Sequence, residues 1–274
     1  MSVCNRVSDW VSGLGVAAVL LALAGCATPP PADDPDAVAD FRETNDPLEP
    51  TNRVMYAIND QFDKYIFRPL AIGYRDILPQ VVRDHTHEFL DNMGMPAQLV
   101  NDMLEGKPRH AGNTMMRFLS NSTLGLGGLF DVATDFGYPD HDADSGITLS
   151  QWGMPNGPYL YLPLFGPSSP REALGMGMDY AVDPFSWVGN DNTDKDLGYV
   201  RIGISALDAR SRVLDDLDKM TASALDPYAT IRSLYRQHRQ SQIEDAADDD
   251  APTIPAWFPA ETRNQGKTAG GTKP

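Results

Sequence analysis

Proline residues divide this chain into stretches whose large apolar side chains recur every three or four residues, and this pattern constrains the fold most. Such spacing puts the apolar side chains on one face of an α-helix, while proline ends or restarts a helix. We therefore expect four helices in the first half of the chain. They run from Thr51 to a closing Pro69, from Pro79 to a restart at Pro96, from there to a C-cap at Gly106, and from Pro108 to Leu124.

Helical spacing returns in the last third of the chain. One long helix is expected to carry Val200, Ile204, Leu207, Leu214 and Leu217. A last helix should begin at Asp226 and Pro227. Aspartate is favoured at the N-cap of a helix, and proline is favoured at the first helical position. No segment shows the sustained alternation of a β-strand, so the sequence predicts a mainly α fold.

The N-terminus has the layout of a secretory signal peptide. Arg6 precedes an apolar run over 11–24 that is too short and too rich in small residues for a membrane span. The run ends in Leu23-Ala24-Gly25-Cys26, which resembles a bacterial lipobox, whose cysteine is acylated and becomes the new N-terminus. An ordinary cleaved signal beside a chance cysteine is the alternative. We expect a signal peptide over 1–25 and lipidation at Cys26.

Lipidation would remove cysteine chemistry from the mature protein. Cys4 leaves with the signal and Cys26 carries lipid, so no free thiol or disulfide remains. Three acyl chains, at about 0.8 kcal/mol per buried CH₂, would make the anchor effectively permanent. Ala27, rather than Asp, follows the cysteine, which in the usual sorting rule resembles an outer-membrane destination. We expect a lipid-anchored protein on the periplasmic side of the outer membrane, tethered by a linker over 26–44.

The acidic balance of the chain limits its partners. Lys and Arg total 22 against 38 Asp and Glu, which gives a net charge of −16. Nucleic-acid binding requires a cationic surface, so we expect this protein not to bind nucleic acid. The helical stretches fit one domain over 45–240. The acidic residues and scattered Pro and Gly over 241–274 predict a disordered tail.

The middle of the chain is rich in glycine. Residues 123–138 read TLGLGGLFDVATDFGY, with four glycines among large apolar side chains. Glycine lets the backbone bend and approach other surfaces closely. A surface loop over a core and a functional or mobile segment are both consistent with this composition.

Familiar catalytic and metal-binding patterns are missing from the sequence. Asp140, Asp142 and Asp144 alternate as in a calcium loop, but Ser145 and Gln151 stand where such a loop needs Gly and Glu. No His-Glu-x-x-His motif, Gly-x-Ser-x-Gly elbow or phosphate-binding glycine loop occurs. We therefore expect no enzymatic activity, no metal site and no cofactor.

Several ordered motifs resemble those of the VacJ/MlaA family of outer-membrane lipoproteins, over about residues 46–235. The first is the segment Asp46-Pro47-Leu48-Glu49-Pro50-Thr51-Asn52-Arg53-Val54-Met55-Tyr56. The others are Tyr65-Ile66-Phe67-Arg68-Pro69-Leu70, Tyr74-Arg75-Asp76-Ile77-Leu78-Pro79, Arg117-Phe118-Leu119-Ser120-Asn121-Ser122-Thr123-Leu124-Gly125, Leu129-Phe130-Asp131-Val132-Ala133, Gly157-Pro158-Tyr159-Leu160-Tyr161-Leu162-Pro163-Leu164-Phe165-Gly166, Arg171-Glu172 and Leu225-Asp226-Pro227-Tyr228.

The resemblance implies a ring-like (doughnut) arrangement of amphipathic helices within the outer membrane beside a porin trimer. It further implies a passive channel that removes mislocalised phospholipids from the outer leaflet and passes them to a soluble periplasmic lipid carrier, so that lipid asymmetry is maintained. The family's flexible loop would fall at about 127–148. A structural envelope lipoprotein that braces porins without moving lipid is the alternative, and a lipid hydrolase is a third hypothesis.

On this resemblance, the glycine-rich stretch is the candidate lipid channel or gate. Its residues are Leu124, Leu126, Gly127, Gly128, Leu129, Phe130 and Val132. For each apolar one, a place in the protein core is the competing interpretation. Asn52, Arg53 and Arg68 lie in the family motifs, and we expect them to tie helices together rather than to contact lipid.

Overall fold

The computed structural model describes residues 46–186 and 192–247. The signal peptide, Cys26, the linker up to residue 45 and residues 248–274 lie outside the described residues. The prediction of a disordered tail from residue 241 is wrong for 241–247, which complete the last helix. Hydrogen bonds from Gln240 to Glu244 and from Ser241 to Asp245 join side chains one turn apart there.

The elements are helices of 4 to 25 residues and one small hairpin. They are α3 (Glu49–Phe62), a π-helical turn η1 (Asp63–Phe67), α4 (Arg68–Ile77), α5 (Gln80–Leu104), α6 (Pro108–Thr123), α7 (Val132–Asp135), α8 (Ser145–Gln151), β1 (Leu160–Leu162), β2 (Gly166–Ser168), α9 (Pro170–Val182), a 3₁₀ turn η2 (Pro184–Ser186), α10 (Asn192–Arg212), α11 (Leu214–Ser223) and α12 (Pro227–Ala247). The strands pair antiparallel, with Leu160 opposite Ser168 and Leu162 opposite Gly166.

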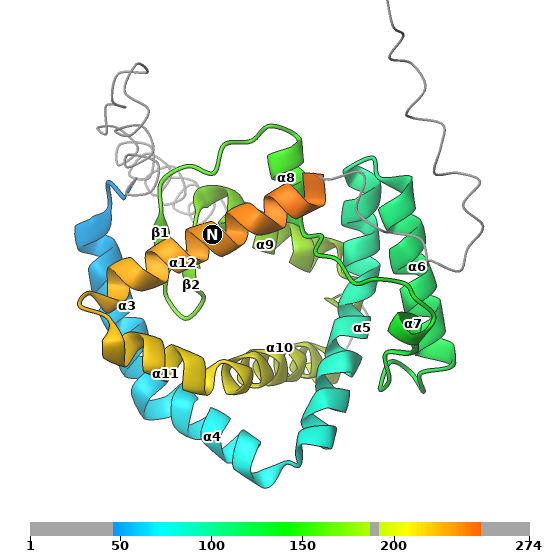
Figure 1. Ribbon diagram of the computed structural model, residues 1–274, viewed down its shortest axis with the longest axis horizontal. Helices are drawn as coiled ribbons and strands as arrows, with labels where there is room; N and C mark the ends of the chain where they lie inside the picture. Colours follow the sequence, from blue (N-terminus) through cyan, green and yellow to red (C-terminus); the bar gives the residue numbers. More distant parts are fainter. Residues whose placement is uncertain (1–45, 187–191, 248–274) are drawn as a thin grey trace, which may run out of the picture.

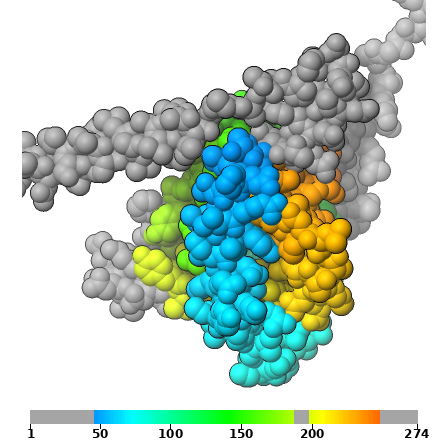
Figure 2. All heavy atoms as spheres, turned by 90° about the vertical axis from the view of Figure 1, so that its left-hand side faces the viewer, coloured from blue at the N-terminus to red at the C-terminus, as the bar shows by residue number. Residues whose placement is uncertain are grey.

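The helices are arranged in a ring (Figure 1), as the family resemblance implies. Helices α3 and α4 lead into α5, which forms one side, and α10 and α11 cross opposite α8, α9 and α12. Helix α6 packs along the outer side of α5 and carries α7 with it (Figure 1). Figure 2 shows α3 in front, with α12 and α11 beside it and α4 below. The protein is therefore mainly α, as predicted.

Three predicted helix boundaries are wrong. Pro96 does not restart a helix, because α5 runs unbroken through it from Gln80 to Leu104. Pro69 does not close a helix, because it lies in the first turn of α4, where its missing N–H costs no helical hydrogen bond. The π-helical turn just before it keeps the chain helical from α3 into α4. The predicted helix from Val200 to Leu217 is two helices, separated at Val213. No glycine or proline marks that break in the sequence.

Arg53 and Arg68, which we expected to tie helices together, join α3 and α4 to the last two helices of the ring. Arg53 pairs with Asp226 at the start of α12, 2.6 Å apart. Arg68 pairs with Asp218 of α11, also at 2.6 Å. These contacts confirm the structural role that the sequence predicted for both arginines.

Asn52 joins α3 to the hairpin through the backbone of β1. Its side-chain amide donates to the carbonyl of Tyr159 and accepts from the N–H of Tyr161, each at 2.9 Å. A cluster of tyrosines packs beside it, in which Tyr159, Tyr161 and Tyr228 are buried. Burial raises the pKa of Tyr161 to about 12, so this cluster stays neutral at physiological pH.

Polar residues dominate the buried positions of the described chain, and many large apolar side chains are exposed. Among the described residues, 21 buried polar or charged side chains stand against 10 buried apolar ones. The apolar faces of the amphipathic helices are largely exposed, including Ile77 at 79 % and Val81 at 63 %. Extended apolar surface marks contact with a protein or a membrane. None of the described helices combines the length and the apolar character needed to cross a bilayer.

We expect Asn52→Ala to lower the free energy of unfolding by about 2–4 kcal/mol, because it leaves the buried carbonyl of Tyr159 and the N–H of Tyr161 without their partner. Urea unfolding of the purified protein measures this. Asn59→Ala is the matched control, since Asn59 makes the same pair of bonds to Leu162 and to the exposed Leu164. Equal losses in the two variants would contradict the role of burial.

Candidate functional site

A cavity of about 630 Å³ lies where α5 meets α9, α10 and the segment 139–144. Helix α5 contributes the longest wall, from His87 to Asn101. Asp179, Tyr180 and Asp183 from the end of α9 and Arg201 from α10 line the other side. The cavity thus joins elements that lie far apart in the sequence.

Carboxylates outnumber cations in the wall of this cavity. Burial raises the pKa of Glu88, and the negative charges of Asp131 and Asp91 add to that effect. Burial also raises the pKa of Asp91, which His87 partly offsets. The Arg201 guanidinium is held by Asp183, 2.5 Å away. The wall is therefore polar, and its excess of carboxylates makes the electrostatic potential in the cavity negative.

A buried hydrogen-bond network fixes the start of α8 against α5 and α9. The Asn101 side-chain amide donates to Asp179 at 3.0 Å, and the Ser145 hydroxyl donates to the same Asp179 oxygen at 2.7 Å. The Thr148 hydroxyl donates to the side-chain oxygen of Asn101 at 3.1 Å. Gly175 completes this packing, because a Cβ there would approach the backbone of Gly146 to 2.5 Å.

Arg239 of α12 anchors the end of the 139–144 segment. Its guanidinium makes two hydrogen bonds to Asp144, of 2.8 and 2.6 Å, and a further ion pair with Glu172 of α9. Burial alone would raise the pKa of Asp144, but the hydrogen bonds and charge of Arg239 outweigh it and hold that pKa below its usual range. Asp144 also caps α8 by accepting from the N–H of Ile147.

Arg117 of α6 holds the segment that follows the glycine-rich turn. It donates to the Thr134 hydroxyl at 3.1 Å and to the Tyr138 carbonyl at 2.7 Å, and it pairs with Asp131. The segment 127–148, in which the resemblance implies a flexible loop, contains α7 and α8, and residues 145–148 are buried. It therefore has a defined fold in this structure.

The candidate gate residues lie in the turn between α6 and α7 and, for Val132, at the start of α7, and none of them lines the cavity. Leu124, Leu126, Leu129 and Phe130 are exposed, Leu126 to 69 %. Val132 is half-buried and Gly127 exposed, while Gly128 is buried. The competing interpretation, that the four large exposed residues belong to the core, is therefore wrong. The nearest residues on α5 are His85, whose ring lies 4.4 Å from that of Phe130, and Asn92.

Left-handed backbone geometry shapes this turn. Leu126, Gly127 and Gly128 have φ angles of 52°, 78° and 95°. A Cβ on Gly128 would lie 2.5 Å from the Asn92 side chain, and one on Gly125 would lie 2.2 Å from the carbonyl oxygen of Phe130. The glycines thus permit a tight turn that packs against α5, and Leu126 is strained.

Apart from the acidic residues of the 139–144 segment, the residues that line the cavity have no role in the sequence-based predictions. Glu88 and Asp91 lie one turn apart on α5, so helical spacing alone was a signal that they share a face. Asp179 and Asp183 reach the same cavity only through the packing of α9 against α5. The acidic residues of the 139–144 segment alternate as in a calcium loop, but in the fold Asp144 forms an ion pair with Arg239.

A sequence model of the family described as MlaA lipoprotein matches residues 44–242. The chain belongs to the MlaA lipoprotein family. The resemblance drawn from the motifs is thereby confirmed, and the match extends past residue 240 to residues that the structure places in α12.

Individual relatives of the MlaA family agree with this assignment. The chain is 32 % identical to the intermembrane phospholipid transport system lipoprotein MlaA of Haemophilus influenzae, over 82 % of this chain and 87 % of that protein. It is likewise 32 % identical to the protein of that description from Escherichia coli, over 78 % and 82 %. A Rickettsia bellii protein is 35 % identical, over 74 % and 78 %.

A solved structure also matches the fold. It was reported under the heading "Structural basis for maintenance of bacterial outer membrane lipid asymmetry", and it is 30 % identical in sequence. The TM-score is 0.64, and the alignment covers 72 % of this chain and 98 % of the other. The mainly helical fold is therefore shared with a chain of known structure.

Substitution of the two adjacent glycines should separate backbone strain from packing. Gly127→Ala places a side chain at positive φ in open space, and we expect a loss of about 1 kcal/mol in the free energy of unfolding. Gly128→Ala adds the collision with Asn92, so its loss should be larger. Urea unfolding compares the two. Equal losses would show that Asn92 moves aside freely.

Acid should abolish the contribution of the Asp144–Arg239 pair. We expect Asp144→Asn to cost about 1–2 kcal/mol at pH 7, because the Asp144 side chain is 39 % exposed and Glu172 still pairs with Arg239. Asparagine caps helices as well as aspartate does, so the change isolates the charge.

The contribution of Asp144 to the free energy of unfolding should depend on pH. Because the pKa of Asp144 is lowered in the folded state, its contribution is complete above the unfolded value of about 3.9. It is lost as pH falls through the lower folded value. Urea unfolding from pH 7 to pH 3 should show the difference between wild type and variant shrinking only below about pH 4. A constant difference down to pH 3 would contradict the ion pair.

Proposed function

We propose that this protein is a passive channel through which mislocalised phospholipids leave the outer leaflet of the outer membrane. They are handed to a soluble periplasmic carrier for retrograde transport, which maintains lipid asymmetry. The observation that carries this proposal is the inverted polarity of the ring, in which buried side chains are mostly polar and many large apolar side chains are exposed. The relatives described as phospholipid transport lipoproteins support the substrate class.

The exposed apolar faces of the helices suit a hydrocarbon environment. Exposed side chains such as Ile77, Val81 and Leu70 are more than half exposed on α4 and α5. Removing half of such a side chain from water contributes on the order of 1 kcal/mol, so a ring of them would hold the body at the membrane. The helices satisfy their own backbone hydrogen bonds, as the bilayer interior requires.

The polar cavity suits the headgroup of a phospholipid. A charged head should not cross hydrocarbon, and the cavity offers it carboxylates, amides and the Arg201 guanidinium. The negative potential of the wall gives little help in retaining anionic lipid, which favours passage over storage. No driving force is built into such a path, so transport would be passive.

The apolar turn 124–131 is proposed to guide the acyl chains. Its four large exposed side chains stand at the outer end of α6, against α5, which also forms the longest wall of the cavity. In this arrangement the tails slide along the turn while the head follows the polar wall. Cys26 would hold the protein to the periplasmic side of the outer membrane, beside a porin trimer as partner.

Outer-leaflet phospholipid is the quantity that tests this function. Cells lacking the protein should expose more phospholipid amine to a membrane-impermeant reagent than wild-type cells do. The wild-type chain should reverse the rise, whereas Cys26→Ala should not, because an unanchored chain leaves the membrane. An unchanged outer leaflet, with normal porins, would instead favour the structural envelope lipoprotein. Phospholipid breakdown by the purified protein would favour the hydrolase.

Leu126→Asn tests the turn itself. Asparagine tolerates positive φ better than leucine does, so the variant should fold at least as stably while losing apolar surface. We expect it to leave phospholipid in the outer leaflet at the level of the deletion strain. Leu164→Asn is the matched control, since Leu164 has φ 67° and is 67 % exposed in the hairpin turn. If both variants behave alike, the turn has no specific role.

A further inference from the structure

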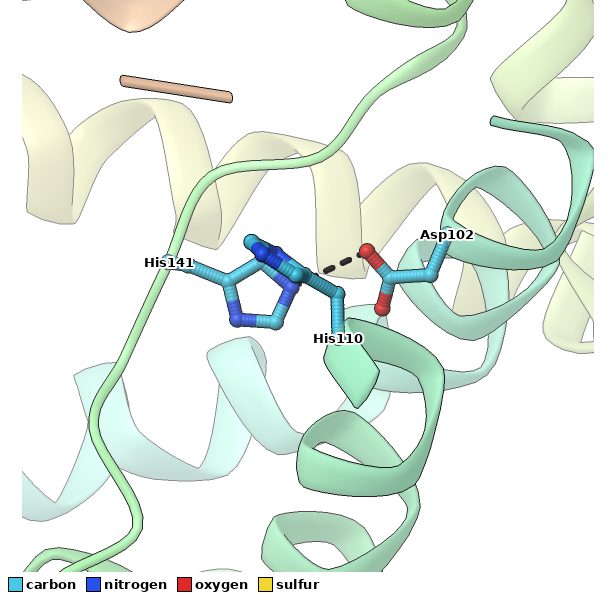
Figure 3. A group of neighbouring side chains, drawn as sticks. All are labelled: Asp102, His110 and His141. Atoms are coloured by element: carbon cyan, nitrogen blue, oxygen red, sulfur yellow. Dashed lines mark hydrogen bonds and ion pairs between the residues drawn. The ribbon is translucent and has the colours of Figure 1, made fainter. Parts of the chain in front are cut away.

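Three metal-ligating side chains from separate segments converge beside the cavity. They are Asp102 near the end of α5, His110 in the first turn of α6, and His141 from the segment 139–144 (Figure 3). One ligand atom of each lies within 4.8 Å of the others. Asp102 and His110 are buried, and His141 also lines the cavity.

The charge of Asp102 is the first reason to consider a cation here. Its side chain is 0 % exposed, and its ion pair is with His141, whose Nε2 lies 3.0 Å from Oδ1. Within the described ranges, no lysine or arginine lies within 4.0 Å of this carboxylate. A buried carboxylate with one imidazole partner is a strong site for a divalent ion, because the ion supplies the missing positive charge.

Neighbouring side chains hold two of the three ligands in place. The Thr114 hydroxyl donates to Asp102 Oδ2 at 2.5 Å. The Asn113 side-chain nitrogen donates to the Pro139 carbonyl at 2.6 Å and lies 3.3 Å from His141 Nδ1. Such outer contacts orient the ligands of metal sites. They also come from α6, so one helix positions both Asp102 and the segment that bears His141.

Asn113 offers a partner for the ligand tautomer that a metal needs. Coordination through His141 Nε2 places the ring proton on Nδ1, which then requires an acceptor. The Asn113 side-chain oxygen is buried and accepts no hydrogen bond from any described residue. Rotation of the amide about its terminal bond would bring that oxygen to Nδ1, in exchange for the hydrogen bond to the Pro139 carbonyl. The zinc-bound imidazole would thus gain an acceptor once the 139–144 segment is held by the ion instead of by Asn113.

We propose that Asp102, His110 and His141 bind one zinc ion. Two imidazoles and a carboxylate form a donor set that suits Zn²⁺, with an open fourth position for water. Zinc bonds of about 2.0 Å place tetrahedral donors about 3.3 Å apart, so Asp102 and His141 already stand at ligand spacing. His110, whose ring lies 4.7 Å from that of His141, would move toward them by rotation of its side chain.

The expectation of no metal site came from looking for ligands close together in the sequence. Asp102 and His110 are eight residues apart on two helices, and His141 follows thirty-one residues later. In the fold, the ion would fasten the 139–144 segment to α5 and α6. That segment supplies the cavity wall from Asp140 to Asp144, so zinc would set the shape of this wall. The inference concerns binding alone and does not depend on lipid transport.

Zinc uptake by the purified mature chain tests the proposal. The protein carries no polyhistidine tag, is stripped with chelator, and is equilibrated with ZnCl₂ before its metal content is measured. We expect one zinc ion per chain, and a rise in unfolding temperature at saturating zinc. His110→Gln and His141→Gln should each weaken zinc binding more than about tenfold. His238→Gln is the matched control, because His238 is exposed on α12 away from the cluster.

A second pair on the same cavity must be separated from this one. His87 contacts Asp91 and Asp208, at 3.2 and 3.0 Å, so His87→Gln shows whether zinc binds there instead. Loss of binding in His87→Gln with full binding in His110→Gln would overturn the proposal, as would no uptake by the wild-type chain. X-ray absorption of the wild-type zinc form gives a result independent of variant folding. Two imidazole ligands are expected, and an oxygen-only shell would overturn the site.

Discussion

Buried amide, hydroxyl and guanidinium groups hold this ring together at positions where a water-soluble domain would use leucine and phenylalanine. Asn52 satisfies two backbone groups of β1, Asn101 joins three elements, and Arg117 fixes the backbone at Tyr138. Each such bond contributes modestly, but a lost partner costs about 1–3 kcal/mol. The ring is therefore specified by directional contacts, and its apolar side chains remain available for the outer surface.

The burial of polar side chains in place of apolar ones also affects the cavity. Because the interior is polar, α5, α9 and the 139–144 segment can meet around a hollow without filling it with large apolar groups. The carboxylates on its wall are tolerated where arginine or histidine stands opposite, as Arg201 does for Asp183. Apolar exposure is concentrated elsewhere, including the turn after α6. Head and tail of an amphipathic molecule would thus meet different surfaces of one protein.

Helical spacing and proline placement predicted the start of α5, the extent of α6 and the cap of α12 well, because those signals are local. Periodicity also identified an apolar face on each helix. It could not show whether that face meets a core or the outside, since both need the same spacing. The break at Val213 carries no local signal of this kind, because no glycine or proline lies there.

The same limit applies to the candidate site. The motif arginines were assigned correctly to helix packing, whereas Asp179 and Asp183 could be placed in the cavity only by the fold. The glycine-rich stretch was found from composition, but its position outside the cavity wall depends on how α6 lies against α5.

Helix α12 touches both the first and the middle part of the described chain. Arg232 pairs with Asp46, Arg239 with Asp144, and Lys107 donates to the carbonyl of Ala246. These anchors are supplied by the last helix of the described chain. A chain cut short before Pro227 would leave Asp46, Lys107 and Asp144 without these partners. Closure of the ring therefore depends on the part of the domain that is synthesised last.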